Sequence, residues 1–269
     1  DQPGIEIRGI KQINGDADHK WERGHEKWSV FTHLNPKANN LYVQFDQAHM
    51  LKQGRSIQRI EYDHDTGKFT QPKPVSPDTY VLFVGLHPYY IPQMRKLFDF
   101  KIYMDTAEDL RLKWKMERDQ ARRGYSEEKI KEQIQKRLPD AEKYIKPQAQ
   151  FADLIIKYLA EDEQKRLTVE YTLSTQWNLE TIFEYLEQQN EKSFTIDHHY
   201  DEAFEKQKVV FAGDISKTCF ETFVQEHIEE FEEIISPGFR FDDGFNGFTQ
   251  FLALNIILQQ SKSNYNPAV

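Results

Sequence analysis

Residues 79–88 read TYVLFVGLHP, an apolar and partly β-branched run that passes directly into a glycine and a histidine. Loop-forming residues bound this run, so it predicts a buried strand that ends near Gly85. Residues 98–104 form a second run of this kind, and residues 91–97 between the two predict a helix. Strands that alternate with helices indicate an α/β fold, with a mostly parallel sheet flanked by helices.

The same kinds of element are expected on both sides of this stretch. A hairpin is predicted around Asp65-Thr66-Gly67, and the proline-containing residues 71–78 are predicted to form a loop. Helices are predicted at 41–52, 107–122, after the N-cap Ser126, at 216–235 and at 245–259, and strands at 10–14, 153–158, 166–173 and 208–212. We expect residues 1–160 to form the α/β domain, and residues 161–269 to form a C-terminal α+β part of the same fold or an appended subdomain.

Composition narrows the class of protein. The 269 residues carry a net charge of −9, which is the opposite sign to that of a dedicated nucleic-acid binder. No apolar run is long enough to span a membrane, so no membrane partner is expected. With Cys219 as the single cysteine, no disulfide can form within the chain, and we expect a cytoplasmic protein. Assembly into a homo-oligomer stays open.

The first candidate site follows the strand at residues 10–14. Asp16 lies just past the end of this strand, where α/β sheets place their sites, and its carboxylate can act as a general base on a hydroxyl. His19 and Arg23 are spaced to add a hydrogen bond and a phosphate contact. The alternative is a polar surface loop, and the residues alone do not decide between the two.

The second candidate site is a run of positive charge in an otherwise acidic chain. Lys113, Lys115, Arg118, Arg122 and Arg123 lie within eleven residues, and Arg118 and Arg122 share a helix face. Such a face can stabilise a transferring phosphate, and the glycine that follows would allow the segment to hinge. The alternative is a solvated helix surface, which is the usual meaning of a run of charges.

Two further motifs are less specific. His87 follows the buried strand at residues 79–84, but its spacing alone favours a hydrogen-bonded structural histidine. Gly67-Lys68 superficially matches the end of a phosphate-binding loop, but Tyr62 stands where that loop requires glycine, and Phe69 follows the lysine. No other stretch matches the motif, and no metal site is predicted.

Taken in order, these motifs resemble the phosphoribulokinase and uridine kinase family, chiefly over residues 10–158. Each motif is weak alone, but six in the right order are specific, and the segments at 38–40 and 139–148 favour the phosphoribulokinase branch. The matching stretches are Gly15-Asp16 with His19 and Arg23; residues 33–40 (HLNPKANN); Tyr62, His64, Thr66 and Gly67; residues 85–88 (GLHP); Arg118-Asp119 with Arg123-Gly124; residues 139–153; and, near the end, residues 244–250.

The resemblance implies a P-loop kinase fold and in-line transfer of the ATP γ-phosphoryl group to a sugar hydroxyl, with Mg²⁺ as cofactor. A sugar phosphate of the ribulose 5-phosphate type is the expected substrate, with a nucleoside such as uridine as the alternative. The implied site residues are Asp16 as base, Arg118, Asp119 and Arg123 at the transferring group, and His19, Arg23, Tyr62, His64, His87 and Lys115 as substrate-binding residues.

Two departures from the family pattern leave a second class of function open. The family's opening strand, phosphate-binding loop and following helix are expected before residue 10, so we expect the sequence to be a partial one, with apolar sheet surface exposed. In addition, Val84 stands where the family has a metal-linked Glu. The alternative is therefore a catalytically degenerate kinase fold that acts as a binding or regulatory module.

Overall fold

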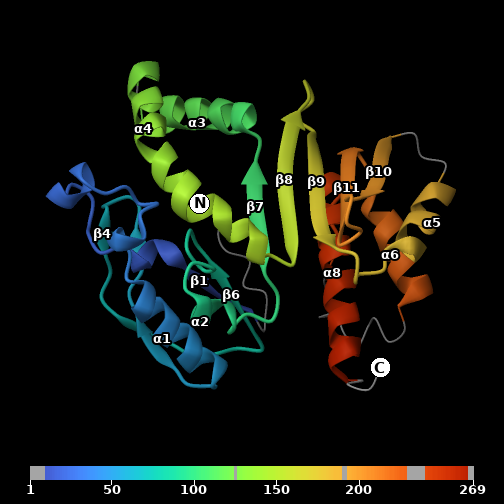
Figure 1. Cartoon of the computed structure of the whole chain (residues 1–269), viewed down its shortest axis with the longest axis horizontal. Helices are drawn as coiled ribbons and strands as arrows, with labels where there is room; N and C mark the ends of the chain where they lie inside the picture. The colour runs from blue at the N-terminus through green and yellow to red at the C-terminus, as the bar shows by residue number, and fades with distance from the viewer. Residues whose placement is uncertain (1–9, 124–125, 190–192, 229–239, 266–269) are drawn as a thin grey trace. The chain divides into compact units, whose positions relative to one another are not determined.

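The computed structural model describes residues 10–123, 126–189, 193–228 and 240–265, of which the side chains at 121–123 and 261–265 are not described. The chain forms two compact units, which are best followed separately in Figure 1. One contains residues 1–101 and 118–151, and the other contains residues 102–117 and 152–269. We call them the first and the second unit. The domain boundary predicted at residue 160 refers to domains of the fold and not to these two units, and it stays a prediction.

The first unit is built on a pair of parallel strands. Strands β1 (Ile10–Asn14) and β6 (Tyr80–Val84) pair in register, with Ile10 opposite Tyr80 and Asn14 opposite Val84. The unit also contains α1 (Leu41–Lys52), β2 (Ile57–Arg59) paired with β5 (Lys73–Val75), β3 (Tyr62–Asp63) paired with β4 (Lys68–Phe69), α2 (Pro92–Arg95) and α4 (Glu127–Asp140). Both strands of the central pair therefore end on the same side, and their carboxyl ends lie next to each other.

The two faces of β6 differ in their surroundings. Val81 and Phe83 point to one face and pack against a core that includes Ile13 and Leu51. The opposite face carries Tyr80, Leu82 and Val84, which are 63%, 49% and 46% exposed. Parallel strands are normally buried on both faces. These partly exposed side chains therefore form the apolar sheet surface that was expected to be exposed.

The second unit contains one mixed sheet of five strands in the order β10-β11-β9-β8-β7. The strands are β7 (Ile102–Thr106), β8 (Leu154–Glu161), β9 (Leu167–Ser174), β10 (Phe194–Tyr200) and β11 (Lys206–Gly213), and within this sheet only β7 and β8 are parallel. The unit also contains helices α5 (Glu180–Gln188), α6 (Lys217–His227) and α8 (Gly244–Tyr265), and the first part of α3 (Glu108–Arg123). The predicted fold class, α/β with flanking helices and a C-terminal α+β extension, is confirmed.

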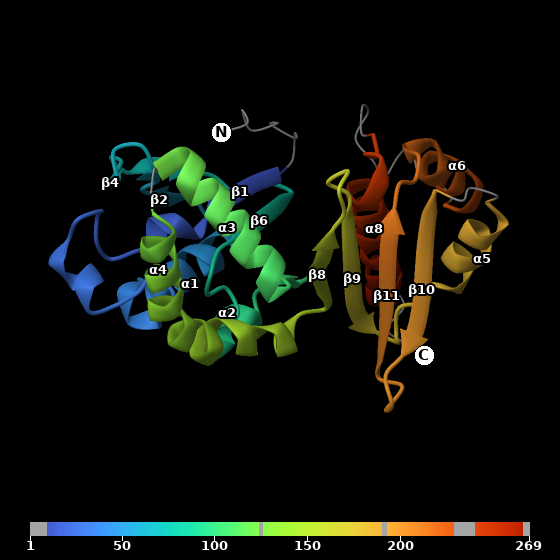
Figure 2. The same cartoon turned by 90° about the horizontal axis from the view of Figure 1, so that it is seen from above.

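Alternation along β9 decides which face of this sheet is covered. Its buried residues, among them Val169 and Tyr171, alternate with polar, partly exposed ones. The Tyr171 and Phe211 rings pack against Phe248 of α8, with centroids 5.3 and 4.8 Å away. Figure 2 shows α8 and α6 next to each other behind the sheet, and Phe220 of α6 joins the same core.

One local prediction was wrong, and two elements were not predicted. Residues 71–78 are not wholly loop, because Lys73–Val75 pairs with Ile57–Arg59 despite the proline at its centre. An edge strand at Phe194–Tyr200 was not predicted, since its sequence holds two histidines and an aspartate, and its pairing with β11 supplies what the pattern lacks. Helix Glu180–Gln188 was also missed. The predicted end of the helix at 216–235 lies outside the described residues.

Candidate active site

The candidate site is centred on the carboxyl ends of β1 and β6. The two backbone segments that follow these strands approach closely here, because a Cβ placed on Gly15 would lie only 3.0 Å from the Cα of Gly85. Asn14, the last residue of β1, accepts a hydrogen bond from the Asp16 backbone N–H at 3.0 Å through its side-chain oxygen. This bond begins a short 3-10 turn at Gly15–Asp18 and fixes where the Asp16 side chain leaves the strand.

Asp16 contacts a histidine from the β3–β4 hairpin. The His64 Nε2 atom lies 3.0 Å from the Asp16 Oδ2 atom, and the Asp16 side chain is 38% exposed. The hairpin turn is held by Asp63, whose carboxylate accepts bonds from the backbone of Asp65 and from both the backbone and hydroxyl of Thr66. These bonds lower the pKa of Asp63, with the Thr66 hydroxyl contributing most. The predicted residues Asp16 and His64 are thus brought together.

Arg23 also contacts the β3–β4 hairpin. Its backbone N–H donates to the Gly67 carbonyl at 2.9 Å, and its guanidinium donates to the carbonyls of Asp65 and His64. Gly67 has a φ of +74°, and a Cβ there would lie 2.5 Å from the Arg23 Cβ, so only glycine fits under this side chain. Arg23 therefore lies at the site, and its described contacts hold the hairpin that presents His64.

Aromatic rings surround His19, which is buried. The His19 ring lies 4.6 Å from His33, 5.7 Å from Trp28 and 6.2 Å from Tyr62, measured between ring centroids. Burial lowers the pKa of His19, although the negative charge of Asp16 opposes that effect. His19 is consequently a neutral group beside the candidate base at neutral pH, suited to hydrogen bonding rather than to charge pairing.

His33 is a member of this cluster that was quoted in a motif but not predicted as a site residue. Its ring centroid lies 3.9 Å from that of Trp28, and its Nδ1 atom is buried without a hydrogen-bond partner among the described residues. Burial lowers the pKa of His33 to about 3, and the charge of Arg137, together with that of His19 when it is protonated, acts in the same direction. The sequence could not show that the His33 ring packs against the rings of His19 and Trp28.

His87 is buried just after the end of β6. Its Nε2 atom donates to the Leu34 carbonyl at 2.9 Å, and burial lowers its pKa. The segment that holds Leu34 is itself fixed by Asp140, which accepts bonds from the Thr32 hydroxyl at 2.7 Å and from the Asn35 amide at 3.1 Å. His87 thus has the hydrogen-bonded structural surroundings that its spacing favours, and its role in substrate binding stays a prediction.

The predicted cationic residues on α3 (Glu108–Arg123) are distributed over both units. Arg118 and Asp119 belong to the first unit, where the Arg118 Nε atom donates to the fully buried Asp119 carboxylate at 2.9 Å. Lys115 belongs to the second unit, so it is not brought together with Asp16 within one unit. The Arg123 side chain lies outside the described residues. The roles of these residues at a transferring phosphate remain predictions.

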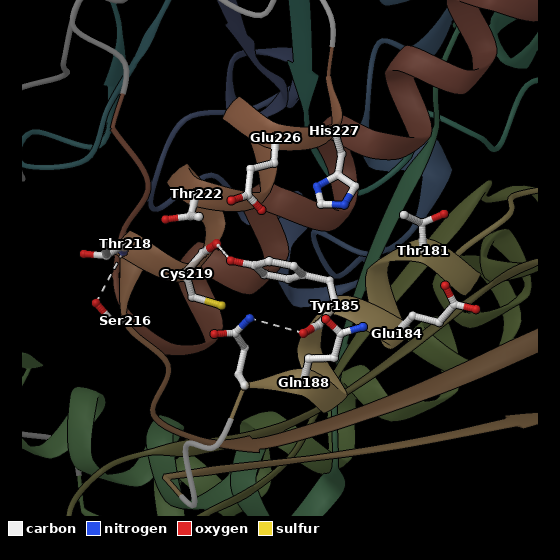
Figure 3. Close-up of a pocket in the computed structure, with 11 residues that line it drawn as sticks. Thr181, Glu184, Tyr185, Gln188, Ser216, Thr218, Cys219, Thr222, Glu226 and His227 are labelled. Carbon is white, nitrogen blue, oxygen red and sulfur yellow. Dashed lines mark hydrogen bonds between the residues drawn. The ribbon is translucent and has the colours of Figure 1, made fainter.

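A hollow of about 610 Å³ lies elsewhere, between α5 and α6 of the second unit. Figure 3 shows side chains from both helices facing it, with the Tyr185 hydroxyl donating to the Cys219 carbonyl at 3.0 Å. Glu184 and Glu226 also line it. None of the predicted site residues lies there, so this hollow is separate from the candidate active site.

Comparison with known proteins shows the family to which the chain belongs. The model of the "Phosphoribulokinase / Uridine kinase family" matches residues 9–164, which is more than half of the chain. The chain belongs to this family. Phosphoribulokinase from Synechocystis is 39% identical over 156 residues, covering 56% of this chain and 47% of the relative. Chloroplastic phosphoribulokinase from Spinacia oleracea is 37% identical over 160 residues, covering 57% of this chain and 40% of the relative.

The fold is also similar to a solved family structure. Phosphoribulokinase from Rhodobacter spheroides superposes with a TM-score of 0.61 at 20% identity, covering 85% of this chain and 89% of that one. The chain spans about half or less of the length of the curated phosphoribulokinases it matches. Within the part of the chain that the structure describes, no helix is both long and apolar enough to cross a membrane.

Proposed function

We propose that this family member carries the acceptor-binding half of an ATP-dependent phosphotransferase that moves the γ-phosphoryl group to a hydroxyl of a sugar phosphate. The observation that carries the proposal is the accessible Asp16 carboxylate at the carboxyl end of a parallel strand, 3.0 Å from His64. The phosphoribulokinase relatives support a sugar phosphate of the ribulose 5-phosphate type as acceptor. A nucleoside is the alternative acceptor within the same reaction.

In this proposal Asp16 is the general base. As the acceptor oxygen forms its bond to the γ-phosphorus, the bond from that phosphorus to the bridging oxygen breaks, ADP leaves, and the hydroxyl proton passes to the Asp16 carboxylate. His64 orients the carboxylate through its 3.0 Å contact, so Asp16 is positioned before the acceptor binds. Pre-positioning of this kind removes much of the entropic barrier to reaction.

The neighbouring side chains suit a polyhydroxylated acceptor. His19 and Tyr62 present hydrogen-bonding groups near the base, and Arg23, which binds the β3–β4 hairpin, brings a positive charge to the same region. A guanidinium whose N–H groups already meet backbone carbonyls can still attract a phosphate through its charge. These residues would therefore bind the sugar and favour an anionic substituent on it.

ATP, when bound, would supply the phosphoryl group, and Mg²⁺ is the expected cofactor of the family reaction. No stretch of the 269 residues matches the Gly-x-x-x-x-Gly-Lys-Ser/Thr loop. Among the described residues, no group of three or more His, Cys, Asp or Glu side chains could hold a metal ion. Asp16, His64 and the side chains around them fit the acceptor side of the reaction.

A binding or regulatory module with a degenerate kinase fold is the second candidate. Val84 favours it, because this residue ends β6 opposite Asn14 and its side chain offers no oxygen to a metal or a metal-bound water. A site without catalysis would not need an accessible carboxylate oriented by a histidine, which favours the kinase. The two candidates differ in whether ATP is consumed.

Acceptor-dependent consumption of ATP separates them. The full-length protein is incubated with ATP, Mg²⁺ and one of a panel of pentose phosphates, pentoses and nucleosides, and ADP formation is followed. ADP formation with one acceptor class supports the kinase and names its substrate. A folded protein that binds an acceptor but forms no ADP with any of them supports the binding module. Val84→Glu should raise the rate of ADP formation if the valine at this position has lowered the activity.

A further inference from the structure

We propose that Arg59 is a positioning residue, which clamps the segment that carries Asp16 by binding it both before and after that residue. The inference rests on the proposed function, because it assigns Arg59 a role through the candidate base. Arg59 and its partner Asp18 were not singled out in the sequence, where each looks like an ordinary surface charge. Both side chains are in fact buried, at 2% and 5% exposure.

The guanidinium of Arg59 contacts two points of the chain at once. Its Nη2 atom donates to the carbonyl of Asn14, the last residue of β1, at 2.6 Å. Its Nη1 atom donates to the Asp18 Oδ1 atom at 3.0 Å and also to Gln47 of α1. Asp16 lies midway between Asn14 and Asp18, so one rigid planar group fixes the chain on either side of the candidate base.

The far side of Asp18 is fixed as well. Its Oδ2 atom accepts a bond from the Gln44 side chain of α1 at 2.7 Å, and its backbone carbonyl accepts one from the Asn40 N–H at 2.7 Å. The short turn at Gly15–Asp18 is therefore tied to β2 through Arg59 and to α1 through Gln44. The Asp16 side chain is the part of this turn that reaches solvent.

Energetics argue against a role in stability alone. A buried ion pair recovers little more than its desolvation cost, and well-packed apolar residues of similar volume are often as stable or more stable. What an apolar pair cannot supply is the directional bonding that holds Asn14 and Asp18 at fixed positions. Displacement of a catalytic group by about 1 Å can lower a rate by about 100-fold. Geometry, rather than stability, is thus the expected benefit of the pair.

The test compares Arg59→Lys and the double variant Asp18→Leu with Arg59→Met. The double variant removes both charges together, so no unpaired buried charge is left, and it should unfold at a urea concentration close to that of the wild type. Arg59→Lys keeps the charge, but a single ammonium cannot replace the planar fork that contacts both points. Lys52→Met, which removes an exposed ion pair with Asp99, is the matched control.

Two readouts are followed in each variant. The first is amide hydrogen exchange at Asp16, whose N–H is bonded to Asn14 and can be measured without any turnover. The second is the kcat and KM of acceptor-dependent ATP consumption. We expect the double variant to stay folded, to exchange the Asp16 amide at least about tenfold faster, and to lose at least about tenfold in kcat with KM for the acceptor changed much less. Arg59→Lys should change both readouts in the same direction.

Unchanged exchange at Asp16 in a folded double variant would overturn the proposal, because the pair would then be core packing only. Faster exchange with unchanged kcat would also overturn it, since the clamp would not matter for the base. If the wild type consumes no ATP, the proposed function fails, and the positioning of Asp16 is decided by the exchange readout alone. A double variant that does not fold is replaced by Arg59→Lys, with the same criteria.

Discussion

Replacing His33 with phenylalanine should make the protein less sensitive to acid. The His33 ring packs against Trp28 and His19, and its Nδ1 atom is buried with no hydrogen-bond partner in the part of the chain that the structure describes, so a phenylalanine ring can take its place with little loss of contact. Burial, together with the charge of Arg137 and that of protonated His19, lowers its pKa to about 3. In the unfolded chain an ordinary histidine titrates near pH 6.5.

The size of the effect follows from these two values. Between pH 6.5 and pH 3 the unfolded chain binds a proton at His33 that the folded protein does not, so stability falls as the pH is lowered through this window. The slope is at most ~1.4 kcal/mol per pH unit, which gives ~2 kcal/mol between pH 7.5 and pH 5. Because the ring is only partly shielded from solvent, we expect about 1–2 kcal/mol.

Urea unfolding at pH 7.5 and pH 5, followed by tryptophan fluorescence, measures this difference. The wild type should lose about 1–2 kcal/mol more than His33→Phe on going to pH 5. His19 and His87, whose pKa values are also lowered by burial, are present in both proteins and cancel in the comparison. His49→Phe, at an exposed position of α1, is the control and should follow the wild type. If His33→Phe loses as much stability as the wild type, the buried neutral state of His33 is wrong.

Three further changes test the packing around the site. Gly15→Ala places a methyl group 3.0 Å from the Cα of Gly85, so thermal unfolding should show a loss of about 1–3 kcal/mol, and an unchanged midpoint would contradict the close approach of the strands. Asp140→Asn leaves one oxygen where the carboxylate accepts from both the Thr32 hydroxyl and the Asn35 amide, so it should cost about 1–3 kcal/mol in urea unfolding; a loss below ~0.5 kcal/mol would mean that the two bonds are not both made. Leu82→Ser on the exposed face of β6 should change stability by less than ~0.5 kcal/mol, whereas a loss of ~2 kcal/mol would show that another element covers that face.

Much of the fold could be predicted because its signals are local. The strand at Tyr80–Val84 is apolar and bounded by loop residues, and the side chain of Ser126 caps the following helix as expected. The edge strand Phe194–Tyr200 could not be predicted, since half-exposed polar residues become a strand only when β11 lies beside them. Lys73–Val75 depends in the same way on its pairing partner.

The residues of the candidate site also divide into those with a local sequence signal and those without one. Asp16 is predictable because a carboxylate just past a parallel strand is a local pattern with a known position in the fold. Its contact with His64 joins segments far apart in the chain, and only the family motifs pointed to it. The buried pair of Arg59 and Asp18 could not be found, because a charged residue in a short strand or turn is usually solvated and only the tertiary structure shows that it is buried.

The central claim is that Asp16 is the base of an acceptor-dependent phosphotransferase, and a comparison of Asp16→Asn with the wild type tests it most directly. Transfer of radiolabelled γ-phosphate from ATP to the acceptor by the full-length proteins is measured with Mg²⁺ at saturating substrate, alongside binding of ATP and of the acceptor. The account predicts transfer by the wild type, a loss of at least about 100-fold in Asp16→Asn, and nearly unchanged binding of ATP. Equal transfer by the two proteins, or no transfer by a folded wild type with any acceptor, would contradict it.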